Sequence, residues 1–255
     1  MARNKRIRFS KENNLSIIKG MTTTTKIFIA AALVFITATT FYGCKKANDR
    51  KPVCRIVTAA FTSLGKIERL SYNSDSKIGL ITNGNLVTNF DYSGKLMIAR
   101  LLDSGRFSKK DIITLNTDGL ASNVRTENNP AGTNWINNAY EYNGQELIRS
   151  VLTNSENNDS TISVYAWQDH NMISITSGGM VQKLEYYKDM PTQKGDYFSF
   201  AQLLQGYEFV RNRNPLKSFA GATFTYEFNP AGNISALAIS FPGSSNNISY
   251  EYQCN

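Results

Sequence analysis

A short pattern recurs along the chain: an aromatic residue, a polar residue and a second aromatic residue, followed by a glycine-containing turn. The clearest copies are Phe90-Asp91-Tyr92-Ser93-Gly94, Tyr140-Glu141-Tyr142-Asn143-Gly144 and Tyr226-Glu227-Phe228-Asn229-Pro230-Ala231-Gly232. Weaker copies lie near residues 70–73, 115–120 and 165–169, and Tyr250-Glu251-Tyr252 ends the series. Successive turns lie about 20–25 residues apart, except for one interval of roughly 41. A repeat of this length indicates one structural unit used many times.

Each copy has the properties of a β-hairpin. Side chains alternate along a strand, so both aromatic residues of a copy lie on one face. Ser93-Gly94 and Asn143-Gly144 suit the positive φ angles of tight hairpin turns. Alternating apolar residues follow the turn, as in Leu237, Ile239 and Phe241, and predict a return strand.

The repeat therefore predicts an all-β domain, an antiparallel meander of repeated hairpins. We expect a curled or barrel-like sheet of about 10–14 strands, because a sheet this wide does not stay open and flat. The aromatic face should point inward, and the sheet should close near the chain termini. The long interval predicts an insertion near residues 188–220, with one short helix over residues 197–206 that ends at Gly206.

The first 43 residues have the composition of a secretory signal. Seven basic residues and one acidic residue accompany an apolar run over residues 27–36. That run is roughly half of the ~20 apolar residues that span a membrane, so a cleaved signal is favoured over an uncleaved anchor. Met21 is an alternative start that gives the same mature protein.

Gly43-Cys44 resembles the lipobox of bacterial lipoproteins, although Phe41 stands where Leu is more usual. The resemblance implies lipidation of Cys44, which becomes the mature N-terminus. We predict a signal peptide over residues 1–43, a tether over residues 44–52 and one β-repeat domain over residues 53–255. The expected location is the cell envelope, with a lipid anchor in the membrane, the outer membrane being favoured. The periplasmic and the surface-exposed orientations both stay open.

The positive charge of the chain belongs mostly to its signal. The full chain has a formal net charge of +8, and removal of residues 1–43 leaves a mature chain of 212 residues at +2. A basic pI ordinarily points to nucleic acid or an anionic surface. Because the mature chain is nearly neutral, we expect no nucleic-acid partner.

Cys54 and Cys254 lie at the two ends of the predicted domain. In an oxidising compartment they could form a disulfide, and the alternative is two buried thiols on strands. A disulfide requires the first and last strands to lie side by side. With one histidine in the chain, the two cysteines offer no metal-ligand spacing, so no metal is expected.

The mature chain resembles a Bacteroidota lipoprotein family of unknown function that has a porin-like β fold. The shared features are the lipobox, the start Cys54-Arg55-Ile56, the hairpin repeats, an insertion near Asn212-Arg213-Asn214-Pro215 and the end Tyr250-Glu251-Tyr252-Gln253-Cys254. The copy Phe90-Asp91-Tyr92-Ser93-Gly94-Lys95-Leu96 also resembles the tyrosine–aspartate (YD) repeat of bacterial wall-associated proteins. These resemblances imply a fold and a compartment, and no activity.

The sequence contains no recognisable catalytic set or cofactor motif. Its one histidine, His170, lies in a predicted turn and is expected to be solvated. Four glutamates on predicted strands alternate with aromatic residues and should lie on the polar face: Glu141, Glu185, Glu227 and Glu251. No phosphate-binding loop or dinucleotide motif occurs, and no cofactor is expected.

We therefore expect a non-enzymatic binding or scaffolding module whose partner is a glycan or an envelope protein. Trp135, in the polar segment Asn134-Trp135-Ile136-Asn137, is the candidate residue for stacking on a sugar. Alternatively, Trp135 covers the end of the core. The alternative function is an acid-pair hydrolase acting on polysaccharide, which needs two carboxylates facing each other across a cleft.

Overall fold

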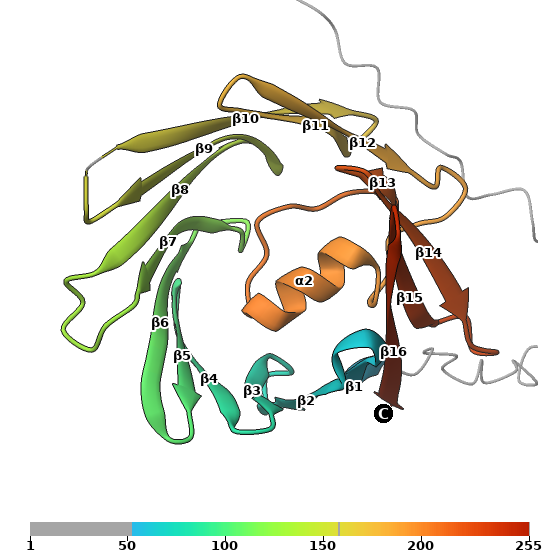
Figure 1. Ribbon diagram of the computed structural model, residues 1–255, viewed down its shortest axis with the longest axis horizontal. Helices are drawn as coiled ribbons and strands as arrows, with labels where there is room; N and C mark the ends of the chain where they lie inside the picture. The colour runs from blue at the N-terminus through green and yellow to red at the C-terminus, as the bar shows by residue number, and fades with distance from the viewer. Residues whose placement is uncertain (1–52, 158, 255) are drawn as a thin grey trace, which may run out of the picture. The chain divides into compact units, whose positions relative to one another are not determined.

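The computed structural model describes residues 53–157 and 159–254. The predicted signal peptide, Cys44 and the predicted tether lie outside the described residues. The strands form one closed antiparallel barrel in which β1 pairs with β16 (Figure 1). The strands are β1 (Cys54–Phe61), β2 (Lys66–Tyr72), β3 (Ile78–Asn83), β4 (Leu86–Ser93), β5 (Leu96–Asp103), β6 (Arg106–Leu115), β7 (Ala121–Glu127), β8 (Trp135–Asn143), β9 (Glu146–Asn154), β10 (Ser160–Gln168), β11 (Asn171–Ser177), β12 (Met180–Tyr186), β13 (Leu216–Phe219), β14 (Ala222–Phe228), β15 (Ile234–Phe241) and β16 (Ser244–Cys254). The helices are the 3₁₀ turn η2 (Thr62–Leu64) and α2 (Tyr197–Gln205).

The predicted all-β fold and its closure near the chain termini are confirmed. The barrel has 16 strands, more than the 10–14 expected. The extra strands include β3 and β13, which are only six and four residues long and lack the aromatic–polar–aromatic pattern.

Successive hairpins turn alternately at the two ends of the barrel. One end, here called the closed end, carries the turns that follow the aromatic pattern, the long connection between Tyr186 and Leu216, and the paired Cys54 and Cys254. The opposite end, here called the open end, carries the other turns, such as Gly178-Gly179. At the closed end, Gly94 and Gly144 have φ angles of 59° and 60°, as the hairpin pattern predicted.

The closed end carries a bulge in most of its strand pairs. Tyr142 pairs with Leu147 while its neighbour Glu141 pairs with Arg149, so Ile148 is an extra residue in the return strand. At this end six pairs of consecutive strands, this one included, show such a shift, and so does the pairing of β1 with β16. Because a bulge increases local twist and bends its strand, this repeated feature helps the wide sheet to curl and close.

A ring of aromatic side chains joins neighbouring strands at the closed end. Each member, near the end of an even-numbered strand, donates a hydrogen bond to a backbone carbonyl near the start of the preceding strand. The seven bonds run from Tyr72 to Ile56, Tyr92 to Ile78, Tyr142 to Ala121, Trp167 to Leu147, Tyr186 to Met172, Tyr226 to Leu216 and Tyr252 to Ile234, at 2.7–3.0 Å. β6 is the exception, because Leu115 takes the aromatic position. The inward aromatic face that the repeat predicted is thus confirmed for these residues, whereas Phe228, the second aromatic of the third clear copy, is 43% exposed.

Helix α2 lies inside the ring of strands (Figure 1). Its Phe200 is 4% exposed and contacts Phe61 and Tyr250, with ring centroids 6.0 and 4.9 Å apart. The predicted end of the helix is confirmed, since Gly206 caps it with a φ of 79°. A Cβ atom at Gly206 would lie 2.5 Å from the Phe90 ring, so the helix end fits closely against β4.

Asp196 fixes the start of α2. Its side chain is 1% exposed and accepts hydrogen bonds from the Ser199 amide and hydroxyl, at 3.1 and 2.8 Å. It also accepts from the Thr192 hydroxyl and the Gln193 amide, at 2.5 and 3.1 Å. One buried carboxylate therefore satisfies four donors from the connection that fills the barrel.

Replacing Asp196 with alanine should lower the free energy of unfolding by about 3 kcal/mol, because several buried donors lose their partner at once. The measurement is chemical unfolding followed by circular dichroism. Asp196→Asn is the matched control and should lose less, since its carbonyl oxygen can still cap the helix. Equal stability of wild type and Asp196→Ala would show that the carboxylate does not hold the insertion.

Candidate functional site

The closed end contains a cavity between α2 and the strands β1–β4 and β6, with a volume of about 530 Å³. We call it the closed-end pocket. Its wall is formed by apolar and aromatic side chains that include Ile56, Ile78, Leu115, Leu203, Tyr72 and Tyr92. Three cationic side chains line the same cavity: Arg55, Lys77 and Lys194.

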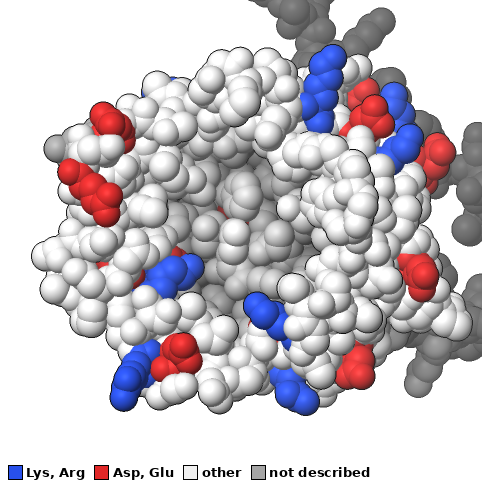
Figure 2. All heavy atoms as spheres, in the orientation of Figure 1, with Lys and Arg blue, Asp and Glu red and all other residues white. Residues whose placement is uncertain are grey.

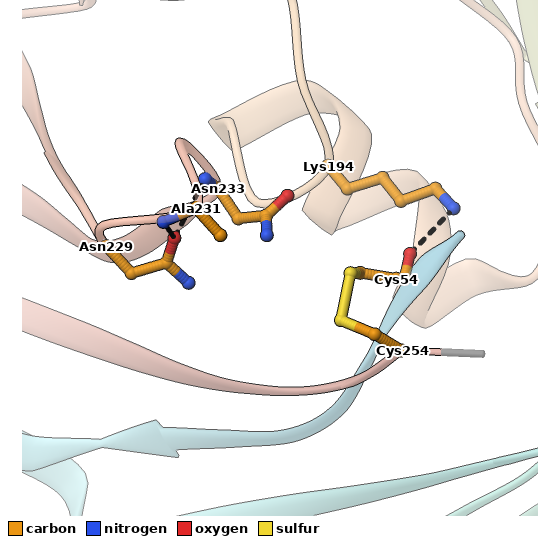
Figure 3. Close-up of a disulfide and its surroundings, with 6 residues drawn as sticks. All are labelled: Cys54, Lys194, Asn229, Ala231, Asn233 and Cys254. Carbon is orange, nitrogen blue, oxygen red and sulfur yellow. Dashed lines mark hydrogen bonds between the residues drawn. A yellow bond between two sulfur atoms is a disulfide. The ribbon is translucent and has the colours of Figure 1, made fainter. Parts of the chain in front are cut away.

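Each of these cations is held close to the pocket wall. The Arg55 guanidinium lies 5.3 Å from the centroid of the Tyr72 ring and donates to the Ser76 hydroxyl at 2.7 Å. The Lys77 ammonium lies 4.9 Å from the centroid of the Tyr92 ring. Lys194 donates to the Cys54 carbonyl at 3.2 Å, beside the disulfide (Figure 3). Burial raises the pKa of Tyr92 to about 12, so this ring is a neutral partner for Lys77 at physiological pH.

Near the open end, in the open half of the barrel, some inward-facing side chains are exposed to solvent. Figure 2 shows a hollow at the centre of the barrel, with walls that are mostly uncharged. Two side chains of the inward-facing rows near the open end, Ile136 and Leu152, are each 39% exposed. They share these rows with Asn138 and the buried Ser150. The open half therefore presents apolar and hydrogen-bonding groups together.

Tyrosine and amide side chains line the inner wall below these residues. Asn138 donates to the Tyr140 hydroxyl at 2.9 Å, and the Tyr140 ring stacks on Phe209 at 5.8 Å between centroids. Tyr165 and Ser150 share a hydrogen bond of 2.8 Å. Among the described residues, the buried Oδ1 of Asn138 has no hydrogen-bond partner. The wall thus contains ring surfaces, hydroxyls and one unsatisfied acceptor.

A second cavity, of about 770 Å³, lies beside β11, β12 and the start of the insertion. Asp169, Glu185 and Asp189 line it together with Lys188 and Lys217. The Glu185 carboxylate lies 3.9 Å from the Lys217 ammonium. Both signs of charge are mixed here, and the side chains of Glu185 and Lys217 are largely exposed.

The four strand glutamates of the acid-pair hypothesis are all exposed, as the alternation predicted. Glu141 and Glu185 both lie on outward rows of the barrel. Glu141 forms an ion pair with Arg149, and Glu185 lies near Lys217. His170 has a φ of 61° in its turn and a side chain that is 79% exposed, with Nδ1 3.3 Å from Glu146. Its expected place in a solvated turn agrees with this geometry.

Trp135 lies on the outward row of β8. The Arg125 guanidinium covers one face of its ring, at 4.8 Å from the centroid. Arg125 also approaches Glu127 at 3.3 Å, and a hydrogen bond from Lys110 holds the pKa of Glu127 below its usual range. The ring is partly buried in this charged cluster, apart from the open half of the barrel. Its role in ligand stacking stays a prediction.

Cys54 and Cys254 are joined by a disulfide and face each other in the pairing of β1 with β16 (Figure 3). Residues 53–157 and 159–254 contain no group of three His, Cys, Asp or Glu side chains that could hold a metal ion. Within the same residues, no helix has the length and apolar character needed to cross a bilayer.

Sequence reasoning missed the closed-end pocket. Arg55, Lys77 and Lys194 lie on separate segments, and nothing in the local pattern around them differs from ordinary solvated lysine or arginine. Only the closure of the barrel and the return of the insertion bring them to one cavity. The signal that could have drawn attention to them is the position of Arg55 directly after Cys54.

Comparison with known proteins identifies a fold. No protein-family model matches the chain, and no curated protein matches it by sequence. A solved structure of a porin-like protein from Bacteroides uniformis ATCC 8492 is similar, with a TM-score of 0.55 and 10% identity over 78% of this chain and 98% of that one. A porin-like protein from Bacteroides vulgatus ATCC 8482 gives a TM-score of 0.54 and 13% identity, with the same coverage. The chain therefore has the porin-like β fold that the sequence resemblance implied.

Proposed function

We propose that this chain is a lipid-anchored, non-enzymatic module of the bacterial cell envelope that binds a glycan in the open half of its barrel. One observation carries the proposal: the chain enters the barrel at the closed end, through Cys54, while the exposed inward-facing side chains of Ile136 and Leu152 lie near the opposite end. A lipid on Cys44 would therefore attach the closed end to the membrane. The open end would then point away from the membrane, where ligands can reach it.

The outward rows support a barrel that is surrounded by water. On β14, β15 and β16 the side chains that alternate with the buried core are small or polar: Thr223, Thr225, Glu227, Ala236, Ala238, Ser240, Ser245, Asn247, Ser249 and Glu251. A membrane-spanning barrel needs an apolar band on the lipid-facing side of every strand. These strands lack such a band, so the proposed contact with the membrane is the lipid.

The chemistry of the open half supports a glycan as ligand. Sugar rings combine apolar faces with hydroxyl groups, and binding sites for such ligands combine apolar or aromatic surface with a few hydrogen-bonding groups. Ile136 and Leu152 supply exposed apolar surface, and the Asn138–Tyr140 and Ser150–Tyr165 pairs place hydrogen-bonding groups on the same inner wall.

The lipid is tested by expressing the full chain in a Gram-negative host. Wild type should fractionate with membranes and incorporate radiolabelled fatty acid, and Cys44→Ala should lose the label, because the acyl chains attach to that cysteine. Labelled Cys44→Ala protein, or wild type without label, would exclude lipidation at this residue.

Glycan binding is tested by calorimetric titration of the full chain with cellohexaose, maltohexaose, xylohexaose and peptidoglycan fragments. At least one of these oligosaccharides should bind. Ile136→Glu or Leu152→Glu should weaken that binding by about tenfold, because each places a charge on the inner wall near the open end. Val164→Glu is the matched control, since Val164 is exposed on the outward row. No binding by any probe, or equal weakening by Val164→Glu, would contradict a glycan site in the open half.

Trp135→Ala separates the two interpretations of that residue. Because the ring packs against Arg125, its loss should lower the melting temperature, and the affinity for the bound oligosaccharide should stay unchanged. A loss of affinity without a change in melting temperature would place the ligand on the outward face instead.

A scaffold that binds an envelope protein is the second candidate. The outward rows of β10 and β12 expose Ile162, Val164 and Val181, at 44, 51 and 59%. Exposed apolar side chains of this kind can mark a protein interface. Cross-linking in cells tests this role. If Val164→Glu abolishes the cross-link to an envelope protein while Ile136→Glu and Leu152→Glu do not, the scaffold role is favoured over the glycan role.

A further inference from the structure

We propose that the closed-end pocket binds a phosphate ester through Arg55 and Lys77, with Lys194 as a third cation. This inference goes beyond glycan binding in the open half, and its membrane setting rests on the proposed lipid anchor. It starts from an imbalance of charge. Three cations line the cavity, and the one carboxylate among the lining residues is Glu208.

None of the three cations has an acidic partner among the described residues. Glu208 is engaged elsewhere, since its Oε2 accepts from Arg211 Nε at 2.8 Å. Arg55 uses one bond to Ser76, and Lys77 lies over the Tyr92 ring. A guanidinium has five donors and an ammonium has three, so most of the hydrogen-bonding capacity at the cavity is left for a ligand.

The donor set matches phosphate chemistry. Arginine binds phosphate oxygens in a planar, two-pronged geometry, and lysine adds a compact positive charge. The tyrosine hydroxyls at the wall are already committed, since Tyr72 and Tyr92 donate to backbone carbonyls. The pocket therefore recognises an anion through its cations, while the rings form a neutral wall.

The size and wall of the cavity favour an ester over a bare ion. A volume of about 530 Å³ exceeds what inorganic phosphate fills and lies in the range of small-molecule sites. Ile56, Ile78 and Leu203 give the cavity an apolar side that can take the organic part of an ester. A glycerol-phosphate group carries both parts.

The position of the pocket gives this chemistry a source in the membrane. Lys194 contacts Cys54, where the chain enters the barrel, so the pocket is at the anchor end. Cys54 lies ten positions after Cys44, and an extended chain of ten residues spans at most about 36 Å. If Cys44 carries the lipid, headgroups of anionic phospholipids lie within reach of the pocket, and soluble phosphate esters are the other source.

The test is calorimetric titration of the full chain in non-ionic detergent with four probes. These are sodium phosphate, glycerol 3-phosphate, dihexanoyl phosphatidylglycerol and, as the probe without phosphate, glycerol. The two esters should bind and glycerol should not. Arg55→Gln and Lys77→Gln should each weaken ester binding by about tenfold, as expected for loss of one charge-assisted contact. Lys183→Gln, an exposed lysine on β12, is the matched control and should leave binding unchanged.

The pattern of affinities identifies the source of the ester. Tighter binding of the phosphatidylglycerol than of glycerol 3-phosphate supports a lipid headgroup, and equal binding of the two supports a soluble ester. The proposal is overturned if neither ester binds better than glycerol, or if folded Arg55→Gln and Lys77→Gln proteins with wild-type melting temperatures bind as wild type does. These titrations need neither the lipid nor an oligosaccharide. A failure to bind phosphate esters would therefore not contradict the lipid anchor or glycan binding, which are tested by fractionation and by the oligosaccharide titrations.

Discussion

Raising the pH from about 9 to about 12 should unfold the barrel cooperatively, because its buried phenols favour the protonated form in the folded state. Burial raises the pKa of Tyr92, Tyr140 and Tyr252 to about 12. The pKa values of six further tyrosines are also raised, mainly by burial: Tyr72, Tyr142, Tyr186, Tyr207, Tyr226 and Tyr250.

The direction of the effect follows from proton linkage. The pKa of an unfolded tyrosine is about 10, so the folded state binds more protons than the unfolded state between about pH 10 and 12. The stabilisation from each phenol is therefore fully present below pH 10 and is lost as the pH rises through the folded value. Tyrosinate absorbance and circular dichroism should change together in one transition. A rise in tyrosinate absorbance from these nine tyrosines at about pH 10, with the fold intact, would show that their hydroxyl groups are open to solvent.

Loss of the disulfide should be the most damaging covalent change. The bond joins residues 200 positions apart, and the chain-entropy argument gives about 5 kcal/mol for a loop of that length. We expect the double variant Cys54→Ser/Cys254→Ser to lose about 3–5 kcal/mol, measured by chemical unfolding under oxidising conditions.

Cys44→Ser is the matched control for that experiment. It removes the cysteine that takes no part in the disulfide, so the free energy of unfolding should not change. Reduction of wild type should reproduce the double variant. A double variant as stable as wild type would mean that the pairing of β1 with β16 holds the barrel closed without the covalent bond.

The local parts of this fold could be predicted from the sequence. Residues two apart on a strand share a face, so the spacing of Tyr140 and Tyr142 is enough to indicate an inward row. Gly206 marked the end of a helix for an equally local reason, since a left-handed φ favours glycine.

The features that depend on distant segments could not be predicted. The orientation of Trp135 depends on where β8 begins after its loop, and a change of one residue reverses the face of every side chain. The short strand β13 has too little alternation to be recognised, although it completes the barrel. The closed-end pocket forms only where three distant segments of the chain meet. The sequence alone does not indicate which lysine and arginine residues will line the same cavity.

The direct pairing of β1 with β16 also limits how such a protein can change size during evolution. Antiparallel strands alternate in direction, so a ring of them can close only when their number is even. Insertion or deletion of a single strand would leave two parallel neighbours at the junction with the wrong hydrogen-bond pattern. A gene lineage with this architecture therefore keeps an all-antiparallel ring only when it gains or loses strands in pairs, one whole hairpin at a time. Each added hairpin would widen the barrel and add one more aromatic hydrogen bond at the closed end.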